Sequence, residues 1–240
     1  MTTRALVVGG TSGIGFAIAC RIAAESASST VISSWNEPKT IPYANIEFRP
    51  LVVSSMRLIN QSTNAFKTSR EQSLDLLVLT QGIFTMTGRS RTTEEIDNKM
   101  ALHYYGRQRL IRQLLPNVRE NAKFLVVLVV LVVLDGMRGR PPAKLNWDDL
   151  EVMAHFSLSI IYAIQKVLSL ALDVSPDACA ENLLKGLNER SAEVEREGKL
   201  WCCIDVKGQL VPNKLAWGEK ELAKAANHTW KIVDCGLTNA

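Results

Sequence analysis

The chain has 240 residues, of which 47% are hydrophobic, enough apolar material for one α/β domain spanning residues 1–240 with a core of its own. Its net charge of +4 comes from Lys and Arg interspersed with Asp and Glu, which argues against a nucleic-acid-binding surface. Five cysteines show no metal-type spacing, and no secretory signal is recognisable at the N-terminus. We therefore expect a reduced, cytoplasmic protein without a metal site.

The first predicted elements are a strand at residues 5–10, a glycine-rich turn and a helix at residues 13–26. In the turn, GGTSGIG, Gly9 permits a tight bend, Gly13 allows the backbone to approach a pyrophosphate, and Gly15 allows close packing of the helix on the strand. The first N–H groups of the helix then face the phosphates. The pattern predicts a dinucleotide-binding turn, the alternative being a fold kept without its ligand. Its candidate cofactor-binding residues are Gly9, Thr11, Ser12, Gly13, Ile14 and Gly15.

The second predicted strand ends in the polar stretch SSWN, residues 33–36. Sites for NAD commonly carry an acidic residue at this point, where it binds the ribose hydroxyls. No acidic residue stands here, so we expect NADP, with Ser34, Asn36 or Lys39 near the 2′-phosphate. NAD stays the second choice of cofactor, because no arginine is present to bind that phosphate. A simple polar turn is the alternative interpretation.

Apolar runs alternate with helical patterns along the rest of the chain, which predicts a Rossmann-type, doubly wound parallel sheet with helices on both faces. The run FLVVLVVLVVL at residues 124–134 is too short to span a membrane and rich in valine, which favours a central strand buried on both faces over a segment inserted in one leaflet. The further predicted strands are residues 29–34, 47–53, 74–80, 123–134 and 200–206. The further predicted helices are residues 56–69, 93–115, 148–173, 176–197 and 218–231. The stretch after residue 200 is expected to be a strand, a turn at Lys207-Gly208 and a short return.

Three stretches resemble the short-chain dehydrogenase/reductase family over roughly the first 175 residues. They are the GGTSGIG turn, LDLLVLTQGI at residues 74–83, and the helical pattern at residues 94–116. Thr80-Gln81-Gly82 stands where the family typically has Asn-Ala-Gly, which makes Gln81 and Gly82 candidate cofactor-binding residues. The stretches LVLTQGIF, ALHYYGR and CIDVKGQLV are similar to filamentous-fungal members, many of which serve secondary-metabolite pathways. The resemblance implies NAD(P)-dependent reduction of a carbonyl or oxidation of an alcohol on a small molecule, by a chain that could form homo-oligomers through its long helices.

Tyr162 and Lys166 form the Y-x-x-x-K pair that the family uses for proton transfer. Residues four apart share one face of a helix, so the ammonium group can lower the pKa of the phenol from its usual value near 10. The resemblance makes Tyr162 the general acid/base, and makes Lys166 its partner and a ligand of the cofactor ribose. An ordinary solvent-facing stripe is the alternative, and so is a second register that would put Phe156 and Ile160 at these positions, without a titratable group.

The catalytic region departs from the family pattern in three ways. No Ser or Thr stands between Lys123 and His155, so the hydroxyl that polarises the carbonyl has no counterpart. His103 stands at the position of the family's asparagine, where it is either a candidate catalytic residue that holds a water chain or a structural histidine. The Pro-Gly loop is missing, so we expect a fold that lacks one late strand and the substrate loop, as in a truncated member. A catalytically degenerate relative, acting as a cofactor-binding or interaction module, is the alternative function.

Overall fold

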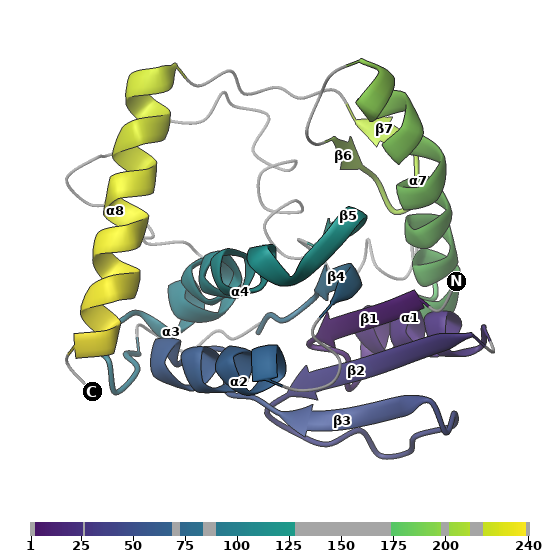
Figure 1. Cartoon of the computed structure of the whole chain (residues 1–240), viewed down its shortest axis with the longest axis horizontal. Coiled ribbons are helices and arrows are strands. Elements are labelled where there is room, and N and C mark those ends of the chain that lie inside the picture. Colours follow the sequence, from purple (N-terminus) through teal and green to yellow (C-terminus); the bar gives the residue numbers. More distant parts are fainter. Residues whose placement is uncertain are drawn as a thin grey trace, which may run out of the picture.

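A five-stranded parallel sheet forms the centre of the computed structural model (Figure 1). Its strand order is β3-β2-β1-β4-β5, so the chain winds outward in both directions from β1 and β4. The predicted doubly wound parallel sheet is therefore confirmed. The strands are β1 (Thr3–Val8), β2 (Ser28–Ser34), β3 (Ile46–Pro50), β4 (Leu74–Leu79) and β5 (Val118–Val126). The structure describes residues 3–25, 27–68, 73–83, 90–127, 174–197, 202–211 and 218–238.

Helices cover both faces of the sheet because side chains alternate along each strand. Val7 and Val78 point to the face covered by α1 (Gly13–Ala23) and α7 (Pro176–Arg196). Val8 and Leu79 point to the face covered by α2 (Met56–Thr68) and α4 (Gly106–Leu114). All four side chains are fully buried, so the apolar core lies in two layers with the sheet between them.

The helix predicted for residues 93–115 begins later and is irregular, which corrects that prediction. It consists of α3 (Asn98–Met100), the π-helical segment η1 (Ala101–Tyr105), α4 and the short 3-10 turn η2 (Leu115–Asn117). The hydroxyl of Thr92 accepts hydrogen bonds from the N–H groups of Glu94 and Ile96 and thereby holds a non-helical turn. The carboxylate of Asp97 then accepts the N–H of Met100 and starts the helix.

Glu94 lies in that turn because its side chain caps a different helix. Its carboxylate accepts the N–H of Met56 at 2.7 Å, the N–H of Arg57 at 3.0 Å and the hydroxyl of Ser55 at 2.7 Å. These groups form the N-terminus of α2, which favours a negative charge. A contact between residues 38 positions apart thus decides the local conformation, and no local pattern predicts it.

The fifth strand and the late strand also differ from the prediction. β5 begins at Val118 rather than at residue 123, and in the part of the chain that the structure describes it pairs only with β4. Val126 is 39% exposed, so the described part of this run is an edge strand and not the central, doubly buried strand expected. Of the predicted strand at residues 200–206, the described residues 202–206 contain only β6 (Cys203–Ile204), which pairs antiparallel with β7 (Leu210–Val211) apart from the main sheet. The predicted turn and short return are confirmed.

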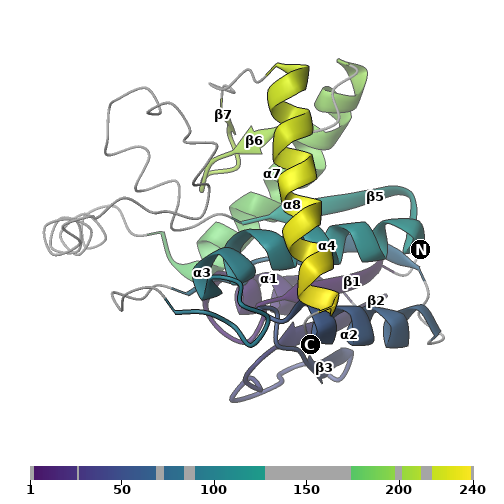
Figure 2. The ribbon, with the colours of Figure 1, turned by 90° about the vertical axis from the view of Figure 1, so that its left-hand side faces the viewer.

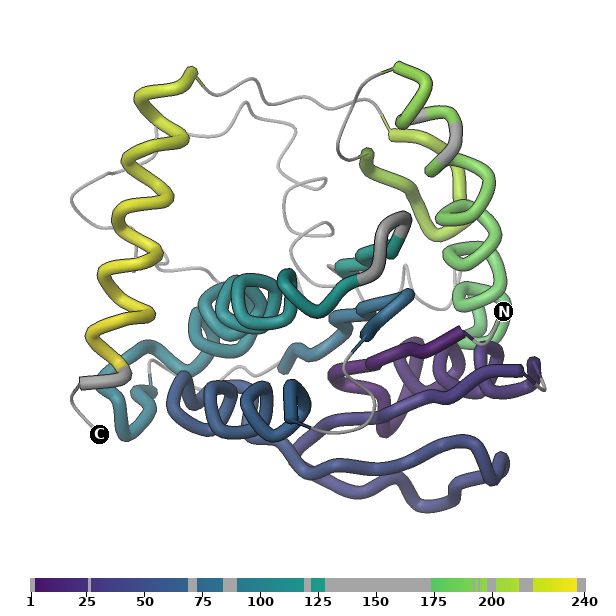
Figure 3. The backbone as a smooth tube through the Cα atoms, viewed as in Figure 1, coloured from purple at the N-terminus to yellow at the C-terminus, as the bar shows by residue number. Residues whose placement is uncertain are grey.

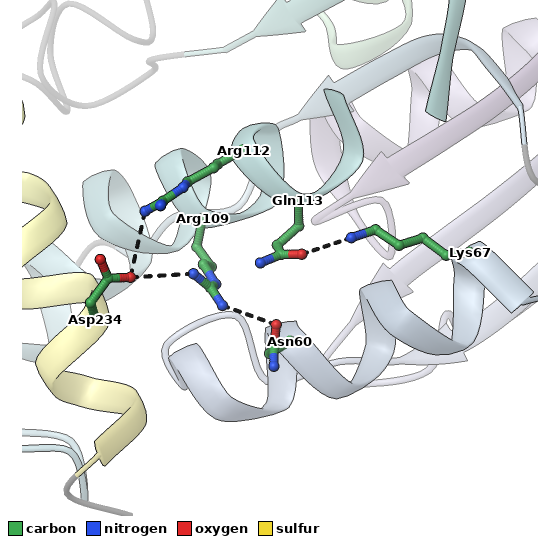
Figure 4. A network of polar contacts seen from close by, with 6 residues as sticks. All are labelled: Asn60, Lys67, Arg109, Arg112, Gln113 and Asp234. Carbon is green, nitrogen blue, oxygen red and sulfur yellow. Dashed lines mark hydrogen bonds and ion pairs between the residues drawn. The ribbon is translucent and has the colours of Figure 1, made fainter. Parts of the chain in front are cut away.

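The last helix, α8 (Glu219–Thr238), continues seven residues beyond the predicted end at residue 231. It stands on the opposite side of the molecule from α7 (Figure 1), with its C-terminal half beside α2 and α4 and its N-terminal half projecting beyond them (Figures 2 and 3). Arg109 and Arg112 of α4 both reach Asp234 of α8, at 3.6 and 3.5 Å (Figure 4). Among the described helices, none combines the length and the apolar character needed to cross a bilayer.

Candidate active site

The carboxyl ends of the central strands lie side by side along one edge of the sheet. In register, Val8 pairs with Ser33 on one side and with Leu79 on the other, and Leu79 pairs with Val126. The sheet order reverses between β1 and β4, so the segments that leave these two strands diverge to opposite faces. Ligands of doubly wound sheets bind in the crevice that this divergence opens.

The glycine-rich turn follows β1 at this crevice. Gly9 has a φ of +88°, and a Cβ atom there would lie only 2.5 Å from the backbone nitrogen of Gln81. A Cβ atom on Gly15 would lie 2.6 Å from the carbonyl oxygen of Gly9. Gly13 differs, because its φ is +57° but no atom lies within 4 Å of a Cβ built on it. Gly9 and Gly15 are therefore required by packing, whereas Gly13 faces open space.

The N-terminus of α1 has the properties of an anion site. Ser12 is the N-cap in an extended conformation, and its side chain makes no capping hydrogen bond. The carbonyl of Ser12 accepts the N–H of Phe16, so the N–H groups of Gly13, Ile14 and Gly15 precede the first helical hydrogen bond. The first turn carries no acidic side chain. These residues therefore fit the phosphates of a dinucleotide, which would bind through backbone N–H groups and the helix dipole.

The end of β2 lies beside the turn. The hydroxyl of Thr11 donates to the hydroxyl of Ser34 at 3.3 Å, which places the predicted 2′-phosphate residue next to the glycines. Asn36 and Lys39 are exposed in the segment that follows. Ser34, Asn36 and Lys39 are therefore all accessible to a ligand that binds over the glycine-rich turn.

The end of β4 is held against β1 by Thr80. Its hydroxyl donates to the carbonyl of Val8 at 3.1 Å, in addition to the sheet bond from its own N–H at 2.8 Å. Gln81 and Gly82 follow, so the two residues that stand for the family's Ala-Gly lie directly beside the turn. A Cβ atom on Gly82 would lie 2.7 Å from Cε1 of His103, which leaves no room for a side chain.

The ring of His103 packs next to Gly82 and contacts the backbone of Ile83 in the segment that follows β4. Its Nε2 atom is 3.0 Å from the carbonyl oxygen and 3.2 Å from the backbone nitrogen of Ile83, so it donates to the first or accepts from the second according to its tautomer. Burial lowers the pKa of His103, and the charges of Arg107 and Lys99 lower it further, while the contact with Ile83 opposes the shift. The ring is therefore favoured in its neutral form, which can both donate and accept a hydrogen bond.

Arg107 is a residue of this edge that the sequence interpretation missed. It stands four residues after His103, within the ALHYYGR stretch, and its guanidinium reaches the ends of two strands. Nη1 donates to the carbonyl of Val127 at 3.0 Å, and Nη2 donates to the carbonyl of Gln81. Burial lowers the pKa of Arg107 to about 10, so it stays charged at neutral pH. The helical spacing from His103 was the signal that could have identified it.

The structure thus brings the predicted cofactor residues and His103 to one edge of the sheet. The second part of the predicted catalytic set, Tyr162 and Lys166, lies outside the described residues, as do Phe156 and Ile160 of the alternative register. The end of the predicted fifth strand, where the family's serine would stand, is the apolar stretch just before Asp135, and it also lies outside the described residues. In its described part, the site therefore contains the glycine-rich turn with its free N–H groups, a histidine favoured in its neutral form and a buried cation.

Comparison with known proteins finds fungal relatives of the chain. It is 31% identical over 169 residues to Oxidoreductase AN1596 of Emericella nidulans, an alignment that covers 66% of this chain and 48% of that protein. It is also 29% identical over 162 residues to the NmrA-like family domain-containing oxidoreductase notO of an Aspergillus species, with 62% and 46% covered. The chain is a relative of fungal oxidoreductases. It spans about half the length of the curated relatives it matches.

No family model matches the chain. Its glycine turn, its strand order and these relatives nevertheless agree with the resemblance to the short-chain dehydrogenase/reductase family, including the fungal part of that resemblance. Among solved structures, a short chain dehydrogenase family protein of Francisella tularensis has a TM-score of 0.47 and 16% identity, with 83% of this chain and 78% of that chain aligned. The blue fluorescent protein from a metagenomic library, solved in complex with NADPH, has a TM-score of 0.43 and 16% identity, with 57% and 59% aligned.

Proposed function

We propose that the chain is an NADP-preferring oxidoreductase of the short-chain dehydrogenase/reductase type. It would reduce a carbonyl or oxidise an alcohol on a small molecule of a fungal secondary-metabolite pathway. The observation that carries the proposal is the turn at the end of β1. There Gly9 and Gly15 are packed too closely for any side chain, while Gly13 opens the N-terminus of α1 to a ligand.

The residues present fit a nicotinamide dinucleotide at this turn. The backbone of residues 12–15 would hold its phosphates, and Ser34, Asn36 and Lys39 would face the 2′-phosphate, with no acidic residue among positions 33–36 to repel it. Gln81 and Gly82 would line the path between β1 and β4. When bound, the nicotinamide supplies or takes up a hydride.

The proton of the reaction is assigned to Tyr162. In reduction, the phenol gives its proton to the carbonyl oxygen while the carbon receives the hydride, and in oxidation the phenolate takes the proton back. Lys166 would favour the phenolate and bind the ribose. His103 holds the loop after β4 and, in its neutral form, would pass hydrogen bonds to water. Because the sequence supplies no Ser or Thr between Lys123 and His155 to polarise the carbonyl, we expect slow turnover on generic carbonyl substrates.

The experiment is a calorimetric titration of the chain with NADPH and NADH, with two variants of Gly13. Gly13→Asp puts a carboxylate in the open space where the phosphates are expected and should abolish binding. Gly13→Asn is the matched control, because Asn has the same shape without the charge and both residues tolerate a positive φ. We expect Gly13→Asn to keep a larger part of the affinity. Failure of the wild-type chain to bind either cofactor would overturn the proposal.

Two further variants test preference and chemistry. Ser34→Asp should repel the 2′-phosphate and shift the preference toward NADH, whereas a wild-type chain that already prefers NADH would contradict the NADP assignment. Tyr162→Phe removes only the hydroxyl, and loss of a general acid/base is typically worth about 10² to 10⁴ in rate. Full activity of Tyr162→Phe on a substrate that the wild type turns over would exclude the tyrosine.

A second candidate function follows from the missing serine. Because no Ser or Thr stands between Lys123 and His155, the chain could be a relative that binds the cofactor without redox turnover and acts as a binding or interaction module. Tight NADPH binding together with the absence of hydride transfer over a panel of aldehydes and ketones would favour this function over the first.

A further inference from the structure

The guanidinium of Arg107 is a buried cation whose bonds are to neutral groups. Arg107 is 4% exposed, and its two described hydrogen bonds go to the carbonyls of Gln81 and Val127. Its Nε atom has no hydrogen-bond partner, and no carboxylate among the described residues pairs with it. Buried charges are costly unless they are paired, and two carbonyl dipoles offset only part of the charge.

The side chain of Gln81 adds unpaired polar atoms at the same place. Gln81 is 5% exposed, and neither Oε1 nor Nε2 has a hydrogen-bond partner. Its own carbonyl is the group that receives Nη2 of Arg107, and the next two residues, Gly82 and Ile83, are exposed. One buried cation and one buried amide therefore lie at the ends of β4 and β5, next to two exposed residues. Native proteins leave few such atoms unpaired, so these require a partner.

Two of these unpaired atoms, Nε of Arg107 and Nε2 of Gln81, are donors and favour a carboxylate, whereas Oε1 of Gln81 is an acceptor that a carboxylate would leave unpaired. A guanidinium and an amide N–H both donate, and carboxylates are the groups that arginine binds with the best geometry. The cofactor phosphates are expected elsewhere, because the N-terminus of α1 lies at the end of β1, on the face covered by α1 and α7. Arg107 comes from α4 on the opposite face and reaches one strand further, to β5. An anion bound at Arg107 would therefore be a group other than these phosphates.

We propose that Arg107 and Gln81 form a subsite for a carboxylate of the substrate, so that the substrates are carbonyl or hydroxy acids. This rests on the proposed function, because it takes the edge of the sheet as the place of reaction. Arg107 would bind one carboxylate oxygen through Nε, and Gln81 would donate from Nε2. The two strand-end carbonyls would keep the guanidinium in place.

The test uses benzoate and benzamide as probes, titrated by calorimetry into the chain saturated with NADP⁺. The two molecules have nearly the same shape, but only benzoate is charged. We expect the wild type to bind benzoate at least tenfold more tightly. Arg107→Gln should remove the preference, and Gln81→Met should reduce the benzoate affinity several-fold. Arg112→Gln is the matched control. Arg112 lies on the same helix as Arg107 but near the C-terminus of that helix, where it pairs with Asp234. This variant should leave the preference for benzoate unchanged.

A second measurement keeps the test decisive if Arg107→Gln does not fold. Gln81→Met keeps the backbone carbonyl that Arg107 uses and removes two unpaired buried atoms, so we expect a higher melting temperature together with weaker benzoate binding. The Nε–H signal of Arg107 in a ¹⁵N spectrum should shift with benzoate and not with benzamide. Equal affinity of the wild type for both probes, or a Gln81→Met variant that binds benzoate normally, would overturn the subsite.

The same titrations distinguish this subsite from the proposed function. If NADP⁺ does not bind but benzoate preference persists, the cofactor proposal fails and the subsite stands. If Arg107→Gln loses NADP⁺ affinity by the same factor as it loses benzoate affinity, the anion is a cofactor phosphate and the substrate subsite is excluded. If NADP⁺ binds and benzoate shows no preference, the subsite alone is wrong.

Discussion

His103 is a half-buried imidazole whose environment favours the neutral ring. Burial is the largest cause of its lowered pKa, followed by the opposing contact with Ile83 and the repulsion from Arg107 and Lys99. The unfolded chain, with an ordinary histidine pKa of about 6.5, therefore binds a proton at pH values where the folded chain does not. The folded state therefore has its full stability at pH values above the pKa of the unfolded chain. It loses stability as the pH falls from there through the lower pKa of the folded chain.

We predict that His103→Asn makes stability less dependent on pH between about 7.5 and 5. Asparagine keeps hydrogen-bonding groups near Ile83 and does not titrate. Melting temperatures of wild type and variant, measured at half-unit steps of pH, should converge as the pH falls, because only the wild type loses stability through His103. If the melting temperatures of wild type and variant changed with pH in parallel, the pKa of His103 would make no measurable contribution to stability.

At the scale of elements, the position of α4 depends on Gly106. A Cβ atom on this residue would lie 2.7 Å from the carbonyl oxygen of Ala101 and would overlap the carbonyl oxygen of Val53. Both are backbone atoms that cannot rotate away, so the helix would have to move. Because Gly106 lies between His103 and Arg107, a shift of the helix would move both residues relative to the strand ends.

We predict that Gly106→Ala lowers the free energy of unfolding by about 1–3 kcal/mol, in spite of the higher helix propensity of alanine. Urea unfolding followed by circular dichroism gives the value. Gly218→Ala is the control, since the nearest atom to its Cβ is Oε2 of Glu221 at 3.6 Å and the site is exposed, and it should change stability by less than about 0.5 kcal/mol. Equal stability of both variants would mean that α4 has room to adjust.

The sequence predicts the elements that depend on local patterns better than the features that depend on contacts between distant residues. The glycine turn and β1, β2 and β4 follow from local patterns, because hydrophobic runs and glycine spacing act over a few residues. The start of α3 could not be predicted, since it depends on Glu94 binding the N-terminus of a helix 38 residues earlier in the chain. The spacing of Arg107 from His103 could have marked it as a residue of the same helix face, but its role at the edge depends on the carbonyls of Gln81 and Val127, which only the folded sheet brings together.

At the scale of the whole molecule, α8 is attached by one half. Val233 is fully buried, and Arg112 stacks on Trp230 at 4.4 Å while it pairs with Asp234 (Figure 4). Residues 219–224 at the other end are all exposed. These contacts of α8 with α4 and the core therefore lie in its C-terminal half, whereas the side chains of its first turns are exposed.

We predict that amides of residues 223–227 exchange with deuterium at least about tenfold faster than those of residues 230–236, since local opening needs fewer contacts to break. Asp234→Asn should speed exchange in the second group by only a few-fold, because the carboxylate is half exposed and such pairs are worth about 1 kcal/mol or less. Exchange in β4 should not change. Uniform protection along α8 would contradict attachment by one half.

The covering of α1 by α7 has a consequence for how the chain reaches this structure. Arg21 of α1 pairs with Glu181 of α7 at 2.6 Å across a sequence separation of 160 residues. During synthesis, the sheet and α1 therefore leave the ribosome long before the helix that covers them. The apolar side of α1 and the sheet face beneath it remain uncovered in that interval, and contacts of such high sequence separation form slowly. Production of the protein should depend on chaperones that shield this face until residue 196 has emerged.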